Sequence, residues 1–371
     1  MNLLDFLIDF SLKNYRERPG KNFIEGGTNG LYFDRETPIR NTCHWLKIFK
    51  KLYDETGDMA YYNSIEKMSN WLVGDNIYFS GATYLFRDKK GKDESNGLIG
   101  PAWTIEGLLA SYEALKDKRL LDRAHDILLL HSFDNASGYW TSRVEPSGEL
   151  LSMDCTLNHQ IWFASSVANY LKHAESDTLR SNLQAFLFRL KENVFLYSNG
   201  LIFHIVKGEF RVSKNRIRRL FTKNYRIEMK QKEYGYHLFN LLGLTIIEKA
   251  NDRLSKKLIG LDSALDYFRN SFNLIESTGF KLRLLNNKYA YPYNPCGFEA
   301  AVVLDNKNKN IMAQEYIDKQ FKKTFDPSTF TFNKTNDVKT LNARVYELTY
   351  LSKISSYTVP ALERAPSTLL L

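Results

Sequence analysis

The sequence lacks the motifs that mark most nucleotide-dependent and metal-dependent enzymes. It has no Walker-type phosphate loop, no G-x-G-x-x-G fingerprint after a strand and no G-x-S-x-G elbow. Its seven histidines form no H-x-x-x-H pair or similar ligand spacing. The absences exclude phosphoryl transfer, nucleotide-dependent redox chemistry and zinc-dependent hydrolysis, and we expect neither a metal nor a cofactor.

Cysteine is scarce and long apolar runs are missing. The three cysteines, Cys43, Cys155 and Cys296, are odd in number and far apart, which argues against a disulfide framework and fits a reducing compartment. Asp5 and Asp9 interrupt the apolar start, which indicates an amphipathic helix rather than a secretory signal. No run approaches the roughly 18 apolar residues that a membrane span needs. We expect a cytoplasmic protein without a membrane span.

Positive charge is abundant but confined. Residues 207–232 contain ten Lys or Arg and two acidic residues, Glu209 and Glu228. This gives a local excess of eight positive charges within a formal net charge of +9. The segment is either a solvated loop or a lip that attracts anions, with Arg216 and Arg218 as candidate substrate-binding residues. Aromatic residues are sparse there, so we expect an acidic glycan rather than nucleic acid as the partner.

Apolar residues recur at intervals of three and four and predict about twelve helices. Their ranges are 2–16, 38–56, 59–74, 102–116, 118–130, 157–173, 177–193, 232–250, 258–274, 297–305, 308–323 and 340–354. Very short polar links such as 55–58 and 116–118 join several of them and suit antiparallel helical hairpins. Longer stretches of strand-like or turn-like character separate the hairpins at 76–88, 138–153, 195–212, 281–293 and 325–332.

Alternating short and long connections are typical of helical hairpins arranged in a ring. We therefore predict an all-α (α/α)6 toroid with small β or loop excursions, although an open solenoid would give the same pairs. No linker rich in proline, glycine or serine divides the chain, so we expect one domain over 1–355. The tail at 356–371 loses helical periodicity, and we expect it to lie outside the fold; an added, vector-encoded extension would look the same.

Chemistry-bearing residues are densest at the head of the helix predicted at 157–173. Asp154 precedes that helix and could simply cap it. A cap does not account for Asn158, His159 and Trp162, which follow within two turns on one face. Aromatic rings and carboxylates at such junctions suit sugars, since rings stack on apolar sugar faces and an acid can protonate the substrate.

The order Asp154, Leu157, Asn158 followed by an aromatic-Ala-Ser run at 163–165 resembles the unsaturated glucuronyl hydrolases and their rhamnogalacturonyl relatives. The resemblance implies a six-hairpin toroid in which the matching Asp acts as general acid and base on an unsaturated uronic acid. It makes Asp154 our catalytic candidate. A second stretch, 97–107, is similar to another motif of that family and contributes Trp103.

Further candidates follow from position alone. Arg40 and His44 lie in the first turns of a predicted helix behind a charged cluster, which is either a cap network or a sugar subsite. Tyr293 belongs to a rigid aromatic turn before Glu299, a candidate second acid that could equally be favoured there by the helix dipole. Glu106, in the second motif stretch, is the remaining candidate acid.

Taken together, the patterns favour a glycoside hydrolase that acts on acidic, uronic-acid-containing oligosaccharides or polysaccharides. The alternatives are a polysaccharide lyase or uronyl epimerase, or a non-catalytic glycan-binding or scaffold protein. Paired carboxylates across a cleft would favour hydrolysis. A cleft rich in Tyr, His and Arg without such a pair would favour elimination or epimerisation. The oligomeric state stays open.

Overall fold

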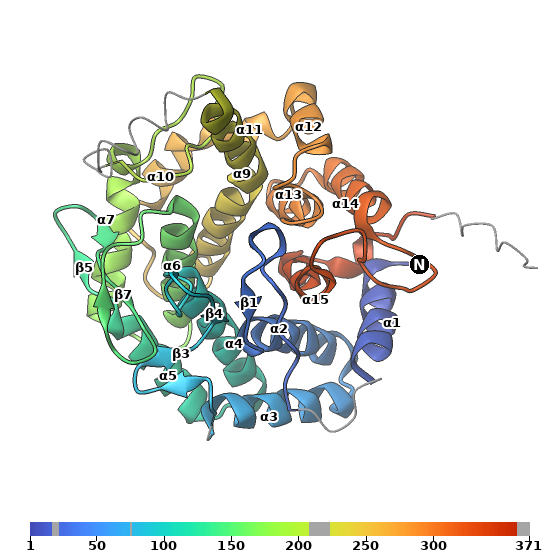
Figure 1. Ribbon diagram of the computed structural model, residues 1–371, viewed down its shortest axis with the longest axis horizontal. Coiled ribbons are helices and arrows are strands. Elements are labelled where there is room, and N and C mark those ends of the chain that lie inside the picture. Colours follow the sequence, from blue (N-terminus) through green and yellow to red (C-terminus); the bar gives the residue numbers. More distant parts are fainter. Residues whose placement is uncertain (17–21, 75, 208–222, 362–371) are drawn as a thin grey trace, which may run out of the picture.

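The computed structural model describes residues 1–16, 22–74, 76–207 and 223–361, and it is built mainly from helices (Figure 1). Inner elements surround the centre of the described ring, and each packs on the next until the last returns to the first. In order they are α2 (Ile39–Thr56), α4 (Ile99–Leu115), α6 (Leu157–Tyr170), α9 (Lys223–Asn251), α13 (Cys296–Asp305), and α15 (Val338–Ala343) continued by the 3₁₀ helix η3 (Arg344–Tyr350). The closed ring confirms the predicted (α/α)6 toroid and excludes the open solenoid.

A second layer of helices covers the outside of the ring (Figure 1). Its members are α1 (Leu3–Arg16), α3 (Met59–Val73), α5 (Lys118–Leu130), α7 (Asp177–Asn193), α10 (Leu261–Tyr267), α11 (Arg269–Leu274), α12 (Thr278–Leu285) and α14 (Asn310–Thr324). On α5 the buried residues recur at helical spacing, from Leu120 through Ala124 to Ile127, so one face is covered. Inner helix α13 is buried along its whole length because neighbours pack on all its faces.

Short polar links join several inner helices to the outer helices that follow them, as predicted. Between α2 and α3, Gly57 takes the left-handed conformation (φ 69°), and the Asp58 side chain accepts a hydrogen bond from the Ala60 N–H at 2.9 Å. Between α4 and α5, Asp117 caps in the same way, accepting from the Arg119 N–H at 3.0 Å. These caps allow one helix to end and the next to begin within two or three residues.

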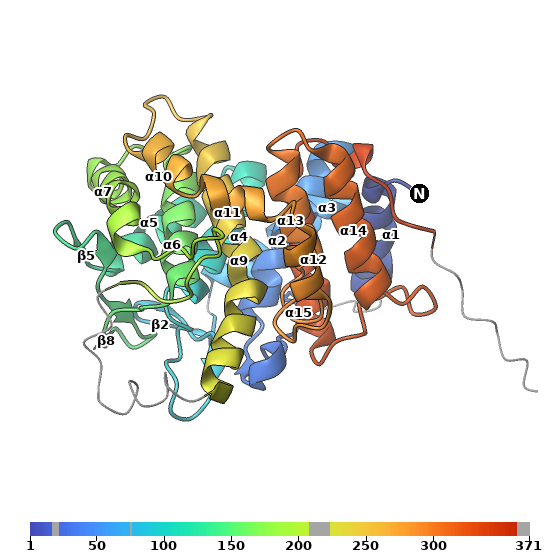
Figure 2. The ribbon, with the colours of Figure 1, turned by 90° about the horizontal axis from the view of Figure 1, so that it is seen from above.

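The long connections carry the strands and gather toward one end of the toroid (Figure 2). All pairs are short and antiparallel: β1 (Arg35–Glu36) with β4 (Arg87–Asp88), β2 (Phe79–Ser80) with β3 (Thr83–Tyr84), β5 (Phe133–Asp134) with β6 (Tyr139–Trp140), and β7 (Arg143–Val144) with β8 (Leu150–Leu151). The strand-like stretches 76–88 and 138–153 therefore hold strands. Stretches 195–207 and 325–332 hold isolated bridges, while 281–285 is helical in α12, contrary to the expectation.

Two predicted helix boundaries were wrong. Helix α9 begins at Lys223 instead of 232, because residues 223–231 are polar and mostly exposed and so carry no apolar periodicity. The helix predicted at 258–274 is interrupted at Phe268, where α10 ends and α11 begins. In the described residues, no helix combines the length and apolar character that a membrane crossing requires.

The first residues of the predicted tail belong to the fold. Tyr357 is buried, and its hydroxyl donates to Asp305 Oδ1 at 2.7 Å. The Thr358 N–H donates to Gln314 Oε1 at 2.9 Å, and Thr358 also bridges to Asn2. The chain therefore closes the ring by joining its last described segment to its first helix, which corrects the expectation for 356–358. Residues 362–371 lie outside the described residues.

Candidate functional site

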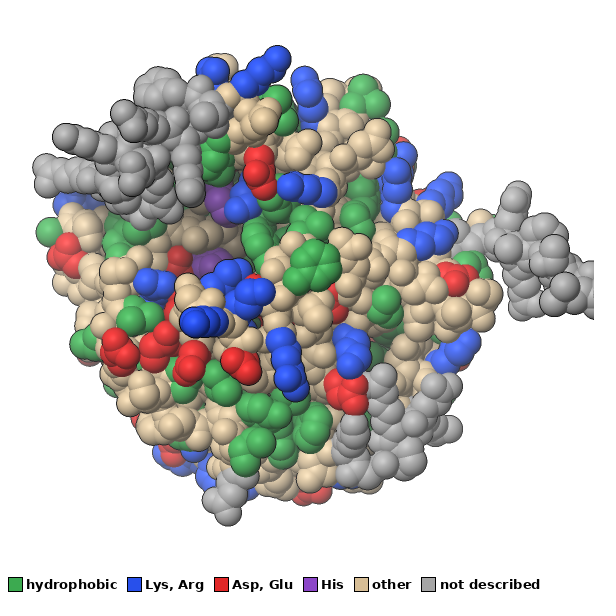
Figure 3. Space-filling model, in the orientation of Figure 1, with side chains coloured by type: hydrophobic (Ala, Val, Ile, Leu, Met, Phe, Trp, Pro, Cys, Tyr) green, Lys and Arg blue, Asp and Glu red, His purple; other side chains and the backbone are tan. Residues whose placement is uncertain are grey.

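The inner helices all begin at the same end of the toroid, which we call the N-terminal mouth. A hollow of about 230 Å³ opens there, and histidine side chains are visible inside it (Figure 3). Its walls come from residues at or near the starts of inner elements, namely Arg40, Trp103, Asn158, His159, Asn294 and Arg344, from Tyr236 farther along α9, and from the long connections. Among the sequence candidates it gathers Arg40, Trp103, Asn158, His159 and Tyr293.

Asp154 and His159 form the central pair of this mouth. Asp154 Oδ2 lies 2.6 Å from His159 Nδ1 and also accepts the Leu98 N–H at 3.0 Å. Its other oxygen, Oδ1, accepts the Thr156 N–H at 3.1 Å. Asp154 is 7% exposed and does not line the hollow, whereas His159 does. The carboxylate thus holds the imidazole from behind, and Nε2 of His159 forms no hydrogen bond with any described residue.

The electrostatics keep Asp154 ionised. Burial alone raises the pKa of its carboxyl group, but the charge and hydrogen bond of His159 and the N–H groups of Leu98 and Thr156 outweigh burial, so the pKa lies well below its usual range. An ionised, triply bonded carboxylate orients a histidine well. It is poorly suited to donate a proton to a substrate.

Gly97 allows the segment before α4 to approach the Asp154–His159 pair closely. Its φ is +63°, and a Cβ at this position would lie 2.0 Å from Asp154 Oδ2 and 2.9 Å from His159 Nδ1. Any side chain would therefore push the pair apart, and the conformation is one that glycine adopts without strain. The second motif stretch, 97–107, thus contributes to the site through its first glycine as well as through Trp103.

A second histidine and a lysine line the same hollow. His204 comes from the long connection after α7, and burial and the charge of Lys232 lower its pKa to about 3, so the imidazole is neutral. Its Nδ1 is buried without a hydrogen-bond partner in the described residues. Lys232 forms no ion pair with any described residue, and burial lowers its pKa. The hollow therefore holds the neutral imidazole of His204 beside a lysine that pairs with no described carboxylate.

Tyrosine hydroxyls form a chain along the rim. Tyr236 donates to Tyr293 at 3.0 Å, and Tyr293 donates to Asn29 Oδ1 at 3.3 Å. The hydroxyl of Tyr32 lies 3.4 Å from that of Tyr236. Burial raises the pKa of Tyr236 far above its usual value, so these groups remain protonated and present donors and acceptors to a ligand.

Arg40 is fixed in the wall by two contacts. Its guanidinium lies 4.0 Å from the centre of the Trp103 ring, and its Nη1 donates to both oxygens of Glu36 at 2.9 and 3.1 Å. His44 accepts from Arg40 Nε at 3.4 Å but is fully buried and stacks on Tyr346 at 4.0 Å. Arg40 therefore faces the hollow, whereas His44 belongs to the aromatic layer beneath it.

Several candidates lie away from the hollow. Trp162 is fully buried, stacks on Phe239 and donates its indole N–H to the Phe239 carbonyl at 3.2 Å. Glu299 is also fully buried and accepts from Arg344 Nη2 at 2.8 Å, while the same nitrogen donates to Glu347 at 2.6 Å. Glu299, the candidate second acid, therefore does not line the hollow, because its side chain points into this ion cluster.

Glu106 lies at the other end of the ring. It comes seven residues after the start of α4, and its carboxylate is bonded to Lys47 and Tyr350 in a separate pocket. The two arginines of the basic segment, Arg216 and Arg218, lie outside the described residues. Within the described residues, no three His, Cys, Asp or Glu side chains are grouped as a metal ion would require.

Sequence reasoning missed some of the residues that line the mouth, notably Tyr32, His204, Lys232 and Arg344. Arg344 and Lys232 sit within helical segments, and only the rotation of those helices directs their side chains inward. His204 lies in a connection with no helical or strand periodicity, and a lone histidine there gives no signal of its own.

The fold is that of six-hairpin toroid enzymes, as shown by solved structures that align over nearly the whole chain. A sugar epimerase from a ruminal bacterium has a TM-score of 0.64 at 14% identity, covering 95% of this chain and 97% of its own. Cellobiose 2-epimerase from Bacillus thermoamylovorans gives 0.60 at 13%, with 94% and 99% covered. Unsaturated glucuronyl hydrolase from Bacillus sp. GL1, a member of the family that the sequence resembles, gives 0.58 at 9%, with 96% and 98% covered.

A curated relative is more similar in sequence than these structures. Archaeal glycosylation protein Q from Haloferax volcanii is 30% identical over 353 residues, which cover 90% of this chain and 93% of that protein. The chain therefore belongs to the family of archaeal glycosylation protein Q. No family model matches the sequence.

Proposed function

We propose that this protein is a carbohydrate-active enzyme that moves a proton on a sugar, as an epimerase or isomerase does. The observation that carries the proposal is the Asp154–His159 pair, 2.6 Å apart, whose imidazole faces a hollow lined by tyrosines and a second histidine. An imidazole oriented by a buried carboxylate is a suitable general base at neutral pH. The relative's name, glycosylation protein, is consistent with a saccharide substrate.

The proposed step is proton abstraction next to a sugar carbonyl. His159 Nε2 accepts the proton, the electrons of the C–H bond form the double bond of an enediolate, and negative charge moves to the carbonyl oxygen. Arg40 and the tyrosine hydroxyls at the rim are placed to bind that oxygen and the sugar hydroxyls. Return of that proton from His159 to the neighbouring carbon of the enediolate would give the isomer. Protonation of the original carbon on its other face by water, with His159 releasing its proton to solvent, would give the epimer.

Hydrolysis of an acidic glycan, with Asp154 as acid, is less well supported. A glycosidase needs a carboxylic acid that carries a proton. Asp154 is held ionised, and Asp34, which lines the hollow, is paired with Lys92 at 2.5 Å and Arg87 at 3.6 Å. An acidic substrate is still supported, because Lys232, which pairs with no described carboxylate, would bind a sugar carboxylate.

Deuterium exchange distinguishes the reactions. The protein would be incubated in D₂O with a panel of neutral and acidic monosaccharides and oligosaccharides and followed by ¹H NMR. Epimerase or isomerase action would replace a single C–H signal with deuterium and produce a new sugar. Hydrolysis would instead release a new reducing end without exchange, and elimination would create an unsaturated product that absorbs in the ultraviolet. Either of these last two results would overturn the proposal.

A further inference from the structure

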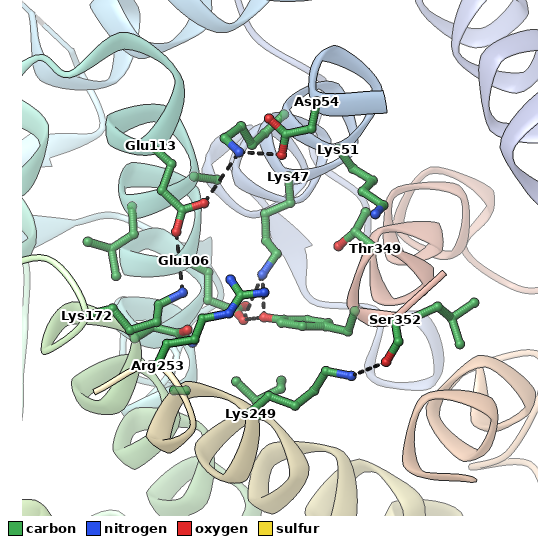
Figure 4. Close-up of a pocket in the computed structure, with 18 residues that line it drawn as sticks. Lys47, Lys51, Asp54, Glu106, Glu113, Lys172, Lys249, Arg253, Thr349 and Ser352 are labelled. Atoms are coloured by element: carbon green, nitrogen blue, oxygen red, sulfur yellow. Dashed lines mark hydrogen bonds and ion pairs between the residues drawn. The ribbon is translucent and has the colours of Figure 1, made fainter. Parts of the chain in front are cut away.

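The opposite end of the ring carries a second pocket, which we call the C-terminal mouth because the inner helices end there. Its volume is about 380 Å³, larger than the hollow of the N-terminal mouth. Six cationic side chains line it, Lys47, Lys50, Lys51, Lys172, Lys249 and Arg253, together with three acidic ones, Asp54, Glu106 and Glu113, an excess of three positive charges. They come from α2, α4, α9 and the residues that directly follow α6 and α9 (Figure 4).

The carboxylates Glu113 and Glu106 of this mouth are already paired with lysines. Glu113 lies 3.4 Å from Lys172 and 3.6 Å from Lys50, and it also contacts His173 at 3.1 Å. Glu106 is bonded to Tyr350 and lies 3.4 Å from Lys47. Neither carboxylate is left to neutralise a further cation.

Two cations of the pocket, Arg253 and Lys249, have at most a distant carboxylate partner among the described residues. Arg253 forms no ion pair with any described residue, and Figure 4 shows its guanidinium reaching over the centre of the pocket. Lys249 donates to Ser352 Oγ at 3.0 Å and lies 3.9 Å from Asp305. A lysine that only balances the negative end of a helix dipole can remain exposed to solvent. The side chains of Lys47 and Lys172 are instead recessed, with 12% and 15% of their surface exposed. Burial lowers the pKa of both ammonium groups, as it does for Lys249.

We infer that the C-terminal mouth binds the phosphate group of a small, water-soluble anion. A phosphate carries close to two negative charges at neutral pH and several acceptor oxygens, so it can bridge cations that approach from different helices. Arg253, Lys249 and Lys172 would supply the contacts. The aromatic layer containing His44, Tyr346 and Trp103 separates this site from the hollow at the N-terminal mouth.

Calorimetric titration in phosphate-free buffer tests the inference, with inorganic phosphate, glucose 1-phosphate and acetate as probes. We expect saturable binding of the two phosphates and much weaker binding of acetate. Arg253→Gln should weaken phosphate binding about tenfold or more, since one charge-assisted contact is lost, and Lys249→Gln should act likewise. Arg119→Gln, which removes an exposed arginine paired with Asp117, is the matched control and should bind as the wild type does.

Other results would overturn the inference. These are the absence of saturable phosphate binding, equally tight acetate binding, or equal weakening by Arg253→Gln and Arg119→Gln, which would reflect net charge alone. Loss of binding in Lys232→Gln but not in Arg253→Gln would assign the phosphate to the N-terminal mouth. Thermal unfolding of each variant checks that the fold is intact, and Arg253 is suited to the test because no described carboxylate loses its partner when it is replaced.

Discussion

The two mouths of the toroid use similar residue types in different ways. At the C-terminal mouth, Lys and Glu neutralise one another in a network around Glu113 and Glu106. At the N-terminal mouth, the carboxylate of Asp154 lies behind His159, and the imidazoles of His159 and His204 line the hollow. Proton transfer requires a group that can exchange its proton near neutral pH. The comparison therefore supports our proposals of proton transfer at the N-terminal mouth and charge recognition at the C-terminal one.

The largest expected effect comes from His159. His159→Ala removes the proposed base, and turnover of the substrate identified by deuterium exchange should fall about 10²- to 10⁴-fold. Glu106→Gln is the matched change at the other mouth and should leave turnover nearly unchanged. Steady-state kinetics of both variants measure the difference. The comparison fails if Glu106→Gln abolishes turnover and His159→Ala does not.

A large stability effect is expected between the mouths, at Arg344. Arg344→Met leaves Glu299 and Glu347 buried without their cation, and such changes cost about 3 to 5 kcal/mol of unfolding free energy. Urea denaturation measures the loss. The control Lys118→Met removes one partner of an exposed ion pair and should change stability by less than about 0.5 kcal/mol. A similarly small effect at Arg344 would mean that Glu299 is free for another role.

A smaller loss of turnover is expected at Asp154. Asp154→Asn cannot hold the His159 imidazole as an anion does, and loss of such an orienting partner typically costs about 10- to 100-fold. Asparagine keeps an oxygen for the Leu98 and Thr156 N–H groups, so the local fold should persist. Turnover near that of the wild type would show that the pair is structural.

Asp154 should also influence how the free energy of unfolding decreases at acid pH. The folded-state pKa of Asp154 is depressed, so its contribution is present above its unfolded pKa, about 4, and is lost as pH falls toward the folded value. Thermal unfolding from pH 6 down to pH 3 should therefore show a shallower decline for Asp154→Asn than for the wild type. Parallel curves would contradict the lowered pKa.

The ring of helical hairpins could be predicted well because the patterns that indicate it lie within short stretches of the sequence. Apolar spacing and short capped links, such as Gly57 with Asp58, determine where hairpins turn. The head of α6 was also predictable, since Asp154 and His159 are five residues apart and meet through the first turn. The depth and rotation of side chains were not predictable. Glu106 lies only three residues beyond Trp103, yet about 4.5 Å of helical rise along α4 is enough for its side chain to line the opposite pocket.

The smallest expected effect comes from replacing Lys232. This change tests whether the N-terminal mouth also recognises charge. Lys232 lines the hollow and forms no ion pair with any described residue. If it binds a sugar carboxylate, Lys232→Gln should raise KM for an acidic substrate about tenfold while kcat stays nearly constant. The salt dependence of KM should also flatten, because the screened charge pair is gone.

Lys230→Gln is the matched control for that change. Lys230 lies two residues earlier on α9, pairs with Glu233 at 3.4 Å and packs over Tyr197, so it does not line the hollow. Its replacement removes the same charge from the same helix and should leave KM unchanged. The ratio of KM values for an acidic sugar and its neutral counterpart is the decisive quantity, since only a direct contact with the carboxylate changes it. An equal rise of KM for both sugars would show that Lys232 shapes the hollow rather than recognising an acid.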